Sequence, residues 1–304
     1  MSEKTTIQDL AGKVLGIRTG EYKNYSPEVL APVPRNLSIE YLGVKMEDLP
    51  GDGFDVWYSY EFRCLTNQGL PVAAAIKFVI PHSSKNIIES KSFKLYCNSF
   101  TMEKLGETKT EALEKACEIM KKDLSKAAEG DVEVSIVTAD NKKPIFNWYR
   151  EITEVVDPKI EVSVYNEEPS LLQVRETDTE REYRFKFDAL RSKCRLTKQP
   201  DSGSVYIYYK SKKHIDEESL VRYLASFYGE CHFHEEILVT IFTRLSKLLN
   251  DRDSLFCTAL YQRRGSLDIG PLQYTDNLPD HEKEIIDNLK AKGIFAFDPM
   301  NLFR

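Results

Sequence analysis

The stretch Leu190-Arg-Ser-Lys-Cys-Arg-Leu-Thr-Lys-Gln-Pro-Asp-Ser-Gly203 lies between two segments with the alternating pattern of β-strands. It places Cys194 in a basic run and Asp201 in a Pro-Asp-Ser-Gly turn. A thiol attacks as its thiolate, which nearby cations favour, and a neighbouring carboxyl can donate a proton to the charge that forms. The stretch therefore predicts a reaction centre on a loop between strands. The alternative is a small core cysteine beside an ordinary turn.

The composition is that of a globular protein, with 30% charged and 41% hydrophobic residues in 304. A formal net charge of −6 argues against direct nucleic-acid binding, which normally shows a basic excess. The first 20 residues are polar and charged, and no apolar run approaches the ~20 residues of a membrane helix. The six cysteines form no C-x-x-C pair. We therefore expect a cytoplasmic protein with reduced thiols and no membrane contact.

The rest of the chain alternates between strand and helix patterns. Strands are expected over 56–62, 72–80, 132–136, 205–209 and 255–261, and helices over 108–130, 216–228 and 235–249. The helix at 108 starts with the capping box Thr108-x-x-Glu111, and Gly130 is its expected stop. Both halves thus repeat hairpin, helical layer and strand. The sequence predicts an α+β fold of two modules, 1–157 and 158–304, each an antiparallel sheet with helices on one face.

A second cluster of reactive side chains is Cys231-His-Phe-His-Glu235, at the start of the helix expected from 235. Cys and His are zinc ligands, but no second cluster supplies the remaining ligands, so we expect no bound metal. Glu235 could simply complement the helix dipole. Alternatively, its carboxylate could accept paired hydrogen bonds from a guanine-type ring edge.

Two further segments raise similar alternatives. Glu89 is either a solvated charge beside Lys91 or part of a buried polar cluster, which would need partners. Arg264 and Gly265 lie in a basic turn that could bind phosphate or be a plain hairpin turn. No G-x-G-x-x-G follows a strand and no P-loop occurs, so a nucleotide cofactor would have to bind outside a Rossmann fold.

Together these motifs resemble one family, the bimodular NADPH-dependent 7-cyano-7-deazaguanine reductases, which are nitrile reductases of queuosine biosynthesis with a tunnelling fold. The resemblance covers nearly the whole chain. Its residues are Pro-Val-Pro-Arg (32–35), Glu-Ser-Lys-Ser-Phe-Lys-Leu-Tyr (89–96), Ser-x-Cys (192–194), Gln-Pro-Asp (199–201), Phe-His-Glu (233–235) and Arg-Arg-Gly-x-Leu-Asp-Ile (263–269). The chain departs from the family pattern at Ser202 and Gly270.

The resemblance implies roles for individual residues. Cys194 would attack the nitrile carbon to form a covalent thioimide, and Asp201 would protonate the nitrile nitrogen. The implied substrate-binding residues are Ile88, Glu89, Ser90, His234 and Glu235. Those implied for NADPH are Ser90, Lys91, Arg264 and Gly265. The implied product is 7-aminomethyl-7-deazaguanine, and the implied assembly is a homodimer.

Two alternatives remain at this point. A zinc-dependent pterin or cyclohydrolase-type enzyme on the same fold would need metal at Cys231, His232 or His234. A non-catalytic purine-binding protein would bind the base without consuming NADPH.

Overall fold

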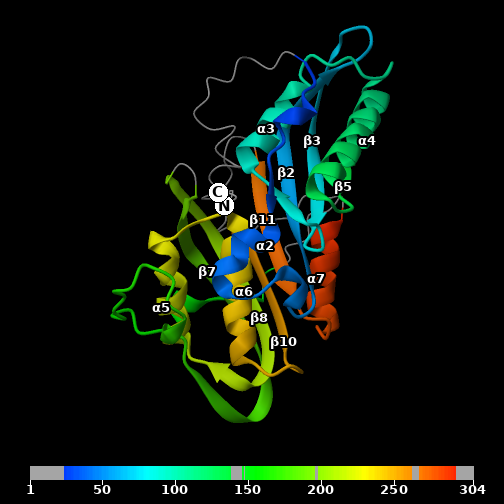
Figure 1. Ribbon diagram of the computed structural model, residues 1–304. Coiled ribbons are helices and arrows are strands. Elements are labelled where there is room, and N and C mark those ends of the chain that lie inside the picture. The colour runs from blue at the N-terminus through cyan, green and yellow to red at the C-terminus, as the bar shows by residue number, and fades with distance from the viewer. Residues whose placement is uncertain (1–23, 138–145, 147, 196–197, 262–266, 292–304) are drawn as a thin grey trace, which may run out of the picture.

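The computed structural model describes residues 24–137, 146, 148–195, 198–261 and 267–291 (Figure 1). The first half contains β1 (Pro32–Pro34), α2 (Arg35–Ile39), β2 (Asp52–Leu65), β3 (Pro71–Pro81), β4 (Asn86–Ile88), α3 (Ser90–Ser99), α4 (Lys109–Ala128), β5 (Glu133–Ile136) and β6 (Arg150–Glu151). The second half contains β7 (Val174–Cys194), β8 (Pro200–Ile215), α5 (Glu217–Ala225), β9 (Cys231–His232), α6 (His234–Leu248), β10 (Ser254–Tyr261), β11 (Leu267–Tyr274) and α7 (Asp280–Lys290).

Local sequence signals account for the hairpin and the long helix of the first half. The turn between β2 and β3 uses Gly69 at φ +88°, a conformation that glycine adopts without strain. Thr108 accepts a hydrogen bond from the Glu111 N–H and so caps α4, as its capping box predicts. The helix ends at Ala128, two residues before the expected limit of 130, because Glu129 takes the left-handed conformation (φ 49°).

Both halves share one sheet. Within the described residues, nine strands form a sheet in which eight follow the order β5-β3-β2-β11-β10-β8-β7-β6, while β9 pairs with β7. The seam between the halves is the antiparallel pair β2–β11, in register from Leu267↔Ser59 to Tyr274↔Asp52. The expected α+β class with antiparallel sheets is confirmed, and the structure adds that the second half continues the sheet of the first.

Helices cover the first-half strands on both sides. Along β2, Trp57 packs in a core with residues of α3 and α4, whereas Phe54 and Val56 pack in a core with residues of α7. Alternate residues of a strand point to opposite faces, so α7 lies on the face opposite to α3 and α4. The buried Lys77 on β3 donates hydrogen bonds to the carbonyls of Leu289 and Ala291 at the end of α7. A helix of the second half therefore completes the packing of the first.

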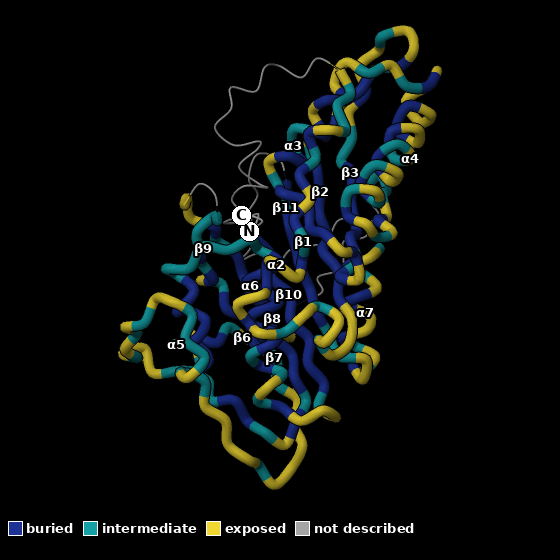
Figure 2. Tube along the Cα trace, in the orientation of Figure 1, coloured by how far each residue is buried: buried dark blue, intermediate teal, exposed yellow. Residues whose placement is uncertain are grey.

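The larger core spans both sides of the predicted boundary at 157–158. Phe146, Tyr149 and Ile152 precede that boundary but pack with β7 and β8, and Phe146 stacks on Tyr206 at 4.0 Å. The buried strands run through the middle of the molecule, and exposed residues gather on its outer helices and loops (Figure 2). The division at 157–158 stays a prediction. No described helix has the length and apolar character needed to span a bilayer.

Candidate active site

Cys194 is the last residue of β7, and Asp201 is the second residue of β8. The Cys194 N–H donates to the Gln199 carbonyl at 2.8 Å, which closes the hairpin. Ser192 lies directly opposite Asp201 in the strand register. Cross-strand partners share a face, as do residues two apart on a strand, so Ser192, Cys194 and Asp201 lie on one face of the hairpin.

The exposure of Cys194 distinguishes it from the core cysteines. All six thiols are free, and Cys194 is half-buried, whereas Cys64, Cys97 and Cys257 are buried. Burial raises the pKa of these three thiols, that of Cys97 to about 12. Burial therefore keeps these three thiols protonated and out of reach at neutral pH, whereas Cys194 is partly exposed at the end of β7.

The first turn of α6 brings His234 to the same face. Its Nε2 lies 3.4 Å from Asp201 Oδ2, and its ring stacks on Tyr261 with centroids 3.8 Å apart and planes 7° apart. Tyr261 faces Gly203 in the strand register, two residues beyond Asp201. The buried His234 Nδ1 has no hydrogen-bond partner among the described residues. A buried ring nitrogen without a partner is suited to bind a polar ligand atom.

Glu235 follows His234 and is 6% exposed. Burial, and then the charge of Asp55, raise the pKa of Glu235 to about 8, while Arg35 opposes the shift. Asp55 itself stays ionised: burial disfavours its charge, but Arg35 and His82 outweigh burial and lower its pKa to about 2. The Arg35 guanidinium donates to Asp55 at 2.6 Å. Glu235 is thus a buried acid beside a fixed negative charge, and donors from a ligand would favour its carboxylate form.

Glu89 acts as the N-cap of α3. Its two carboxylate oxygens accept hydrogen bonds from the N–H groups of Lys91 (3.0 Å) and Ser92 (2.7 Å). Burial raises the pKa of Glu89, and these two backbone donors oppose the shift. Each carboxylate oxygen has two acceptor positions, so Glu89 can still accept from a ligand. The expectation of a buried polar cluster holds, and the partners of Glu89 are two backbone amides and the Ser90 side chain.

An apolar contact links the base-binding candidates of the two halves. Strand β1 pairs with β4, so that Val33 lies opposite Ile87, and Phe233 packs against both. Ile87 precedes Glu89 by two residues, and Phe233 precedes Glu235 by two. The segment carrying Ile88, Glu89 and Ser90 therefore lies beside the start of α6.

His232, one residue of the zinc alternative, has other side-chain partners. Both ring nitrogens of His232 lie 3.0 Å from carboxylates, those of Glu230 and Glu236. Cys231 lies opposite Lys193 in the β7–β9 register, whereas His232 lies opposite Cys194. Among the residues that the structure describes, no group of three His, Cys, Asp or Glu side chains is placed to hold a metal ion.

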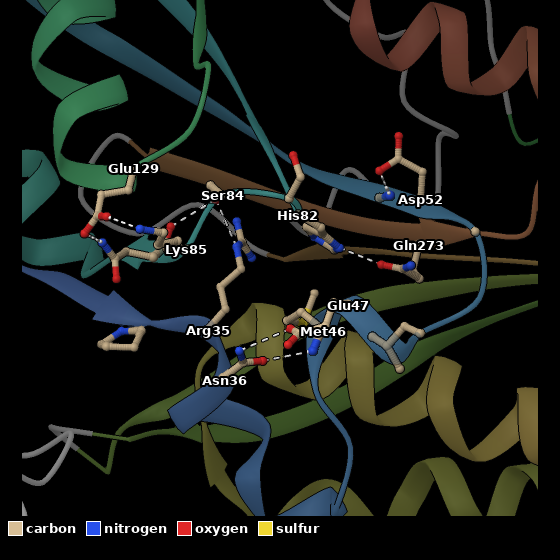
Figure 3. Close-up of a pocket in the computed structure, with 16 residues that line it drawn as sticks. Arg35, Asn36, Met46, Glu47, Asp52, His82, Ser84, Lys85, Glu129 and Gln273 are labelled. Atoms are coloured by element: carbon tan, nitrogen blue, oxygen red, sulfur yellow. Dashed lines mark hydrogen bonds and ion pairs between the residues drawn. The ribbon is translucent and has the colours of Figure 1, made fainter.

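A cavity of about 660 Å³ opens at the other end of β1 and β4, away from Glu89 (Figure 3). Arg35, His82 and Gln273 lie at its base, and none of the predicted site residues lines it. His82 bonds to both Gln273 and Asp55, and Arg35 bonds to Ser84 and Asp55. These side chains fulfil one another's hydrogen-bonding needs. We therefore interpret the base of this cavity as structural support for the region around Glu235.

Comparison with known families identifies the family to which the chain belongs. A family profile described as "Nitrile reductase, 7-cyano-7-deazaguanine-reductase N-term" matches residues 22–136. A second, described as "QueF-like protein", matches residues 200–279, and together the two cover more than half of the chain. The chain belongs to the 7-cyano-7-deazaguanine reductase family. It is a nitrile reductase of queuosine biosynthesis, and therefore an oxidoreductase that needs a reducing cofactor.

The structure gathers three of the predicted site residues, Asp201, His234 and Glu235, around Tyr261. The pKa of Tyr261 is raised first by burial and then by Asp201 and Glu235. Cys194 shares the hairpin face with Asp201 but lies between the two matched segments. Ser90 and Lys91 begin α3. Arg264 and Gly265 lie outside the described residues.

Several residues of this candidate site were not singled out from the sequence. Tyr261 appeared only as a strand residue, and Arg35 only as part of a motif. Asp55, His82 and Glu236 gave no signal at all. Their importance depends on contacts between distant segments, such as the Arg35–Asp55 ion pair.

Replacing Glu235 by glutamine is expected to change how the stability of the empty protein depends on pH. The folded-state pKa of about 8 lies above the unfolded value, so the folded protein binds the proton more tightly. This stabilisation is complete below pH ~4.5 and is lost as the pH rises through the folded pKa, by an amount on the order of a few kcal/mol. Relative to Glu235→Gln, the wild type should lose stability between about pH 5 and 8.

Thermal or urea unfolding across this pH range measures the difference. Glu114→Gln, on the exposed face of α4, controls for the loss of one carboxyl group. Parallel pH profiles for the wild type and Glu235→Gln would show that Glu235 ionises normally.

Proposed function

We propose that the protein reduces 7-cyano-7-deazaguanine to 7-aminomethyl-7-deazaguanine with NADPH, through a covalent thioimide on Cys194. The observation that carries this proposal is the shared hairpin face of Cys194 and Asp201, with His234 in contact with Asp201. A nucleophile, an acid and a buried ring-binding carboxylate are then present in one region.

The chain's own groups account for the first bond change. The Cys194 thiolate forms a C–S bond to the nitrile carbon, and the π-electron pair moves to the nitrogen. Asp201 supplies the proton that this nitrogen takes up, which leaves a C=N–H thioimide. His234, at 3.4 Å, then faces a newly charged Asp201 carboxylate that its ring can stabilise.

Base recognition is assigned to the two buried glutamates. A guanine-type edge presents an N–H and an NH₂ group, which match the paired oxygens of a carboxylate. Within the described chain no other residue donates a hydrogen bond to the Glu235 side chain, and Glu89 keeps free acceptor capacity. Ile88 and Ser90 flank Glu89, and Phe233 supplies an apolar neighbour. Binding of the donors would favour the ionised form of Glu235, so the base should bind with release of a proton.

The start of α3 fits a phosphate-bearing cofactor. Glu89 already accepts from the N–H groups of Lys91 and Ser92, so the cation of the exposed Lys91 and the rotatable hydroxyl of Ser90 are the groups left to contact a phosphate. With Arg264 and Gly265, they are the residues that we assign to NADPH. When bound, NADPH supplies hydride, and reduction of a nitrile to an amine consumes two hydrides and two protons. The Cys194–carbon bond breaks between the two reductions and returns the thiolate.

The purified protein should oxidise NADPH when 7-cyano-7-deazaguanine is added, at two NADPH per amine formed. Loss of the near-ultraviolet absorbance of NADPH, together with mass spectrometry of the product, measures both quantities. Binding of the base without NADPH oxidation would instead identify a purine-binding protein. We further expect a cytoplasmic location and a homodimer. Analytical ultracentrifugation tests the dimer.

A further inference from the structure

The side chain of Glu236 is fully buried in the first turn of α6 and joins three partners. Its Oε1 accepts from the Arg195 guanidinium at 2.6 Å. Its Oε2 accepts from the Phe233 N–H at 2.9 Å and lies 3.0 Å from His232 Nδ1. A buried carboxylate with this many donors is held in one position, because both oxygens are committed to fixed partners.

The partners of Glu236 belong to two segments of the proposed site. Arg195 directly follows the nucleophile Cys194, whereas His232 and Phe233 directly precede the ligand-binding pair His234 and Glu235. The short strand β9 also pairs with the end of β7, with Cys194 opposite His232. Glu236 thus connects the chain just after the nucleophile to the chain just before the base-binding residues.

The surroundings of His232 reinforce this connection. Its second nitrogen lies 3.0 Å from Glu230 Oε2, and Glu230 Oε1 accepts from the Glu167 N–H at 2.9 Å. Tyr41 stacks on the His232 ring at 5.0 Å. The row Arg195–Glu236–His232–Glu230 is therefore joined by successive polar contacts, and Glu230 anchors its far end to the Glu167 backbone.

We propose that Glu236 is a positioning residue that fixes the distance between the Cys194 sulfur and the nitrile of a base held by His234 and Glu235. This inference depends on the proposed function. The geometry suits such a role because the ion pair holds the loop after Cys194 against the helix that carries the base-binding residues. A misplacement of about 1 Å between reacting atoms can cost on the order of 10²-fold in rate.

Glu236→Gln separates this role from a general structural one. The glutamine carbonyl can still accept from the Phe233 N–H, so the start of α6 is retained. Its NH₂ group must then face the Arg195 guanidinium, and two donors repel. We expect the rate of covalent adduct formation, followed by intact mass spectrometry under single-turnover conditions, to fall on the order of 10²-fold. The dissociation constant of the base, measured in a Cys194→Ala background, should change by less than about threefold.

Two further variants test the same ion pair from its other end. Arg195→Met should reproduce the slow adduct formation, and the double variant should be no slower than either single one, because both remove one interaction. Arg195→Lys keeps the charge and should recover most of the rate. Arg195 is partly exposed, so the Arg195 variants still test the ion pair if Glu236→Gln does not fold. Glu111→Gln changes the glutamate at the same position of α4 and should leave the adduct rate unchanged.

The outcomes separate the two proposals. Adduct formation at the wild-type rate in Glu236→Gln and Arg195→Met overturns the positioning role while leaving the reaction intact. An equal loss of base affinity and adduct rate also overturns it, because the residue would then support the binding site as a whole. A wild-type protein that forms no adduct refutes the proposed function and this inference with it.

Discussion

Replacing Cys194 by alanine is expected to abolish the covalent adduct and to lower NADPH oxidation by on the order of 10⁴-fold or more. A linear nitrile is a poor hydride acceptor, and the thioimide is what converts it into a C=N that hydride can reach. Without the sulfur this route is closed, while Glu89 and Glu235 remain to hold the base. Binding of the base should therefore survive with a nearly unchanged dissociation constant, which isothermal titration calorimetry measures.

Cys117→Ala is the matched control for this experiment. Cys117 is also a half-buried free thiol, but it lies in the middle of α4, away from the β7–β8 hairpin. Its replacement should leave adduct formation at the wild-type rate. An adduct of full yield in Cys194→Ala would place the nucleophile elsewhere in the chain.

The second large effect is expected at Asp201. Asparagine has nearly the same shape as aspartate but cannot donate the proton that the nitrile nitrogen requires. We expect Asp201→Asn to slow adduct formation by about 10²- to 10⁴-fold, the usual contribution of a general acid. Since Asp201 is not among the residues assigned to the ring edge, the affinity for the base should change much less than the rate.

Asp216→Asn provides the comparison on the same strand–helix unit. Asp216 caps α5 by accepting from the Ser219 N–H at 2.9 Å, and asparagine caps helices about as well. This variant should match the wild type in stability and in rate. If Asp201→Asn formed the adduct as fast as Asp216→Asn, the proton would have to come from another group, and His234 would be the first to test.

Much of the fold could be predicted because local patterns agree with the final contacts. Strands β2 and β3 form where the segments 56–62 and 72–80 predict them, and Thr108 caps α4 as its motif indicates. Strand β11 gave no comparable signal, because Gly270 and Pro271 weaken a strand pattern. The sheet accommodates Pro271, whose carbonyl accepts from the Thr258 hydroxyl. Helix α3 was missed because glutamate is not a favoured N-cap, yet Glu89 caps it.

Some features of the candidate site could likewise be predicted from the sequence, and others could not. Cys194, Asp201, Glu89 and Glu235 could be proposed because each stands in a motif whose chemistry is readable from neighbouring residues. The ion pair of Arg195 with Glu236 could not, since 41 positions separate the two residues. Likewise, the pKa of Glu235 is raised first by burial and then by the charge of Asp55, which the β2–β11 seam brings near. Such electrostatic effects arise only once the sheet has assembled.

The β2–β11 seam has a consequence for how the enzyme tolerates dilution. Strands β2 and β11 belong to one polypeptide, and so do Glu89 and Glu235. The two glutamates therefore come together by folding of a single chain, at a rate that does not depend on protein concentration. Their effective local concentration is set by the covalent connection and not by how much protein is present. Lowering the protein concentration therefore cannot separate these two glutamates, whereas pulling the two halves apart would expose two unpaired strand edges to the solvent.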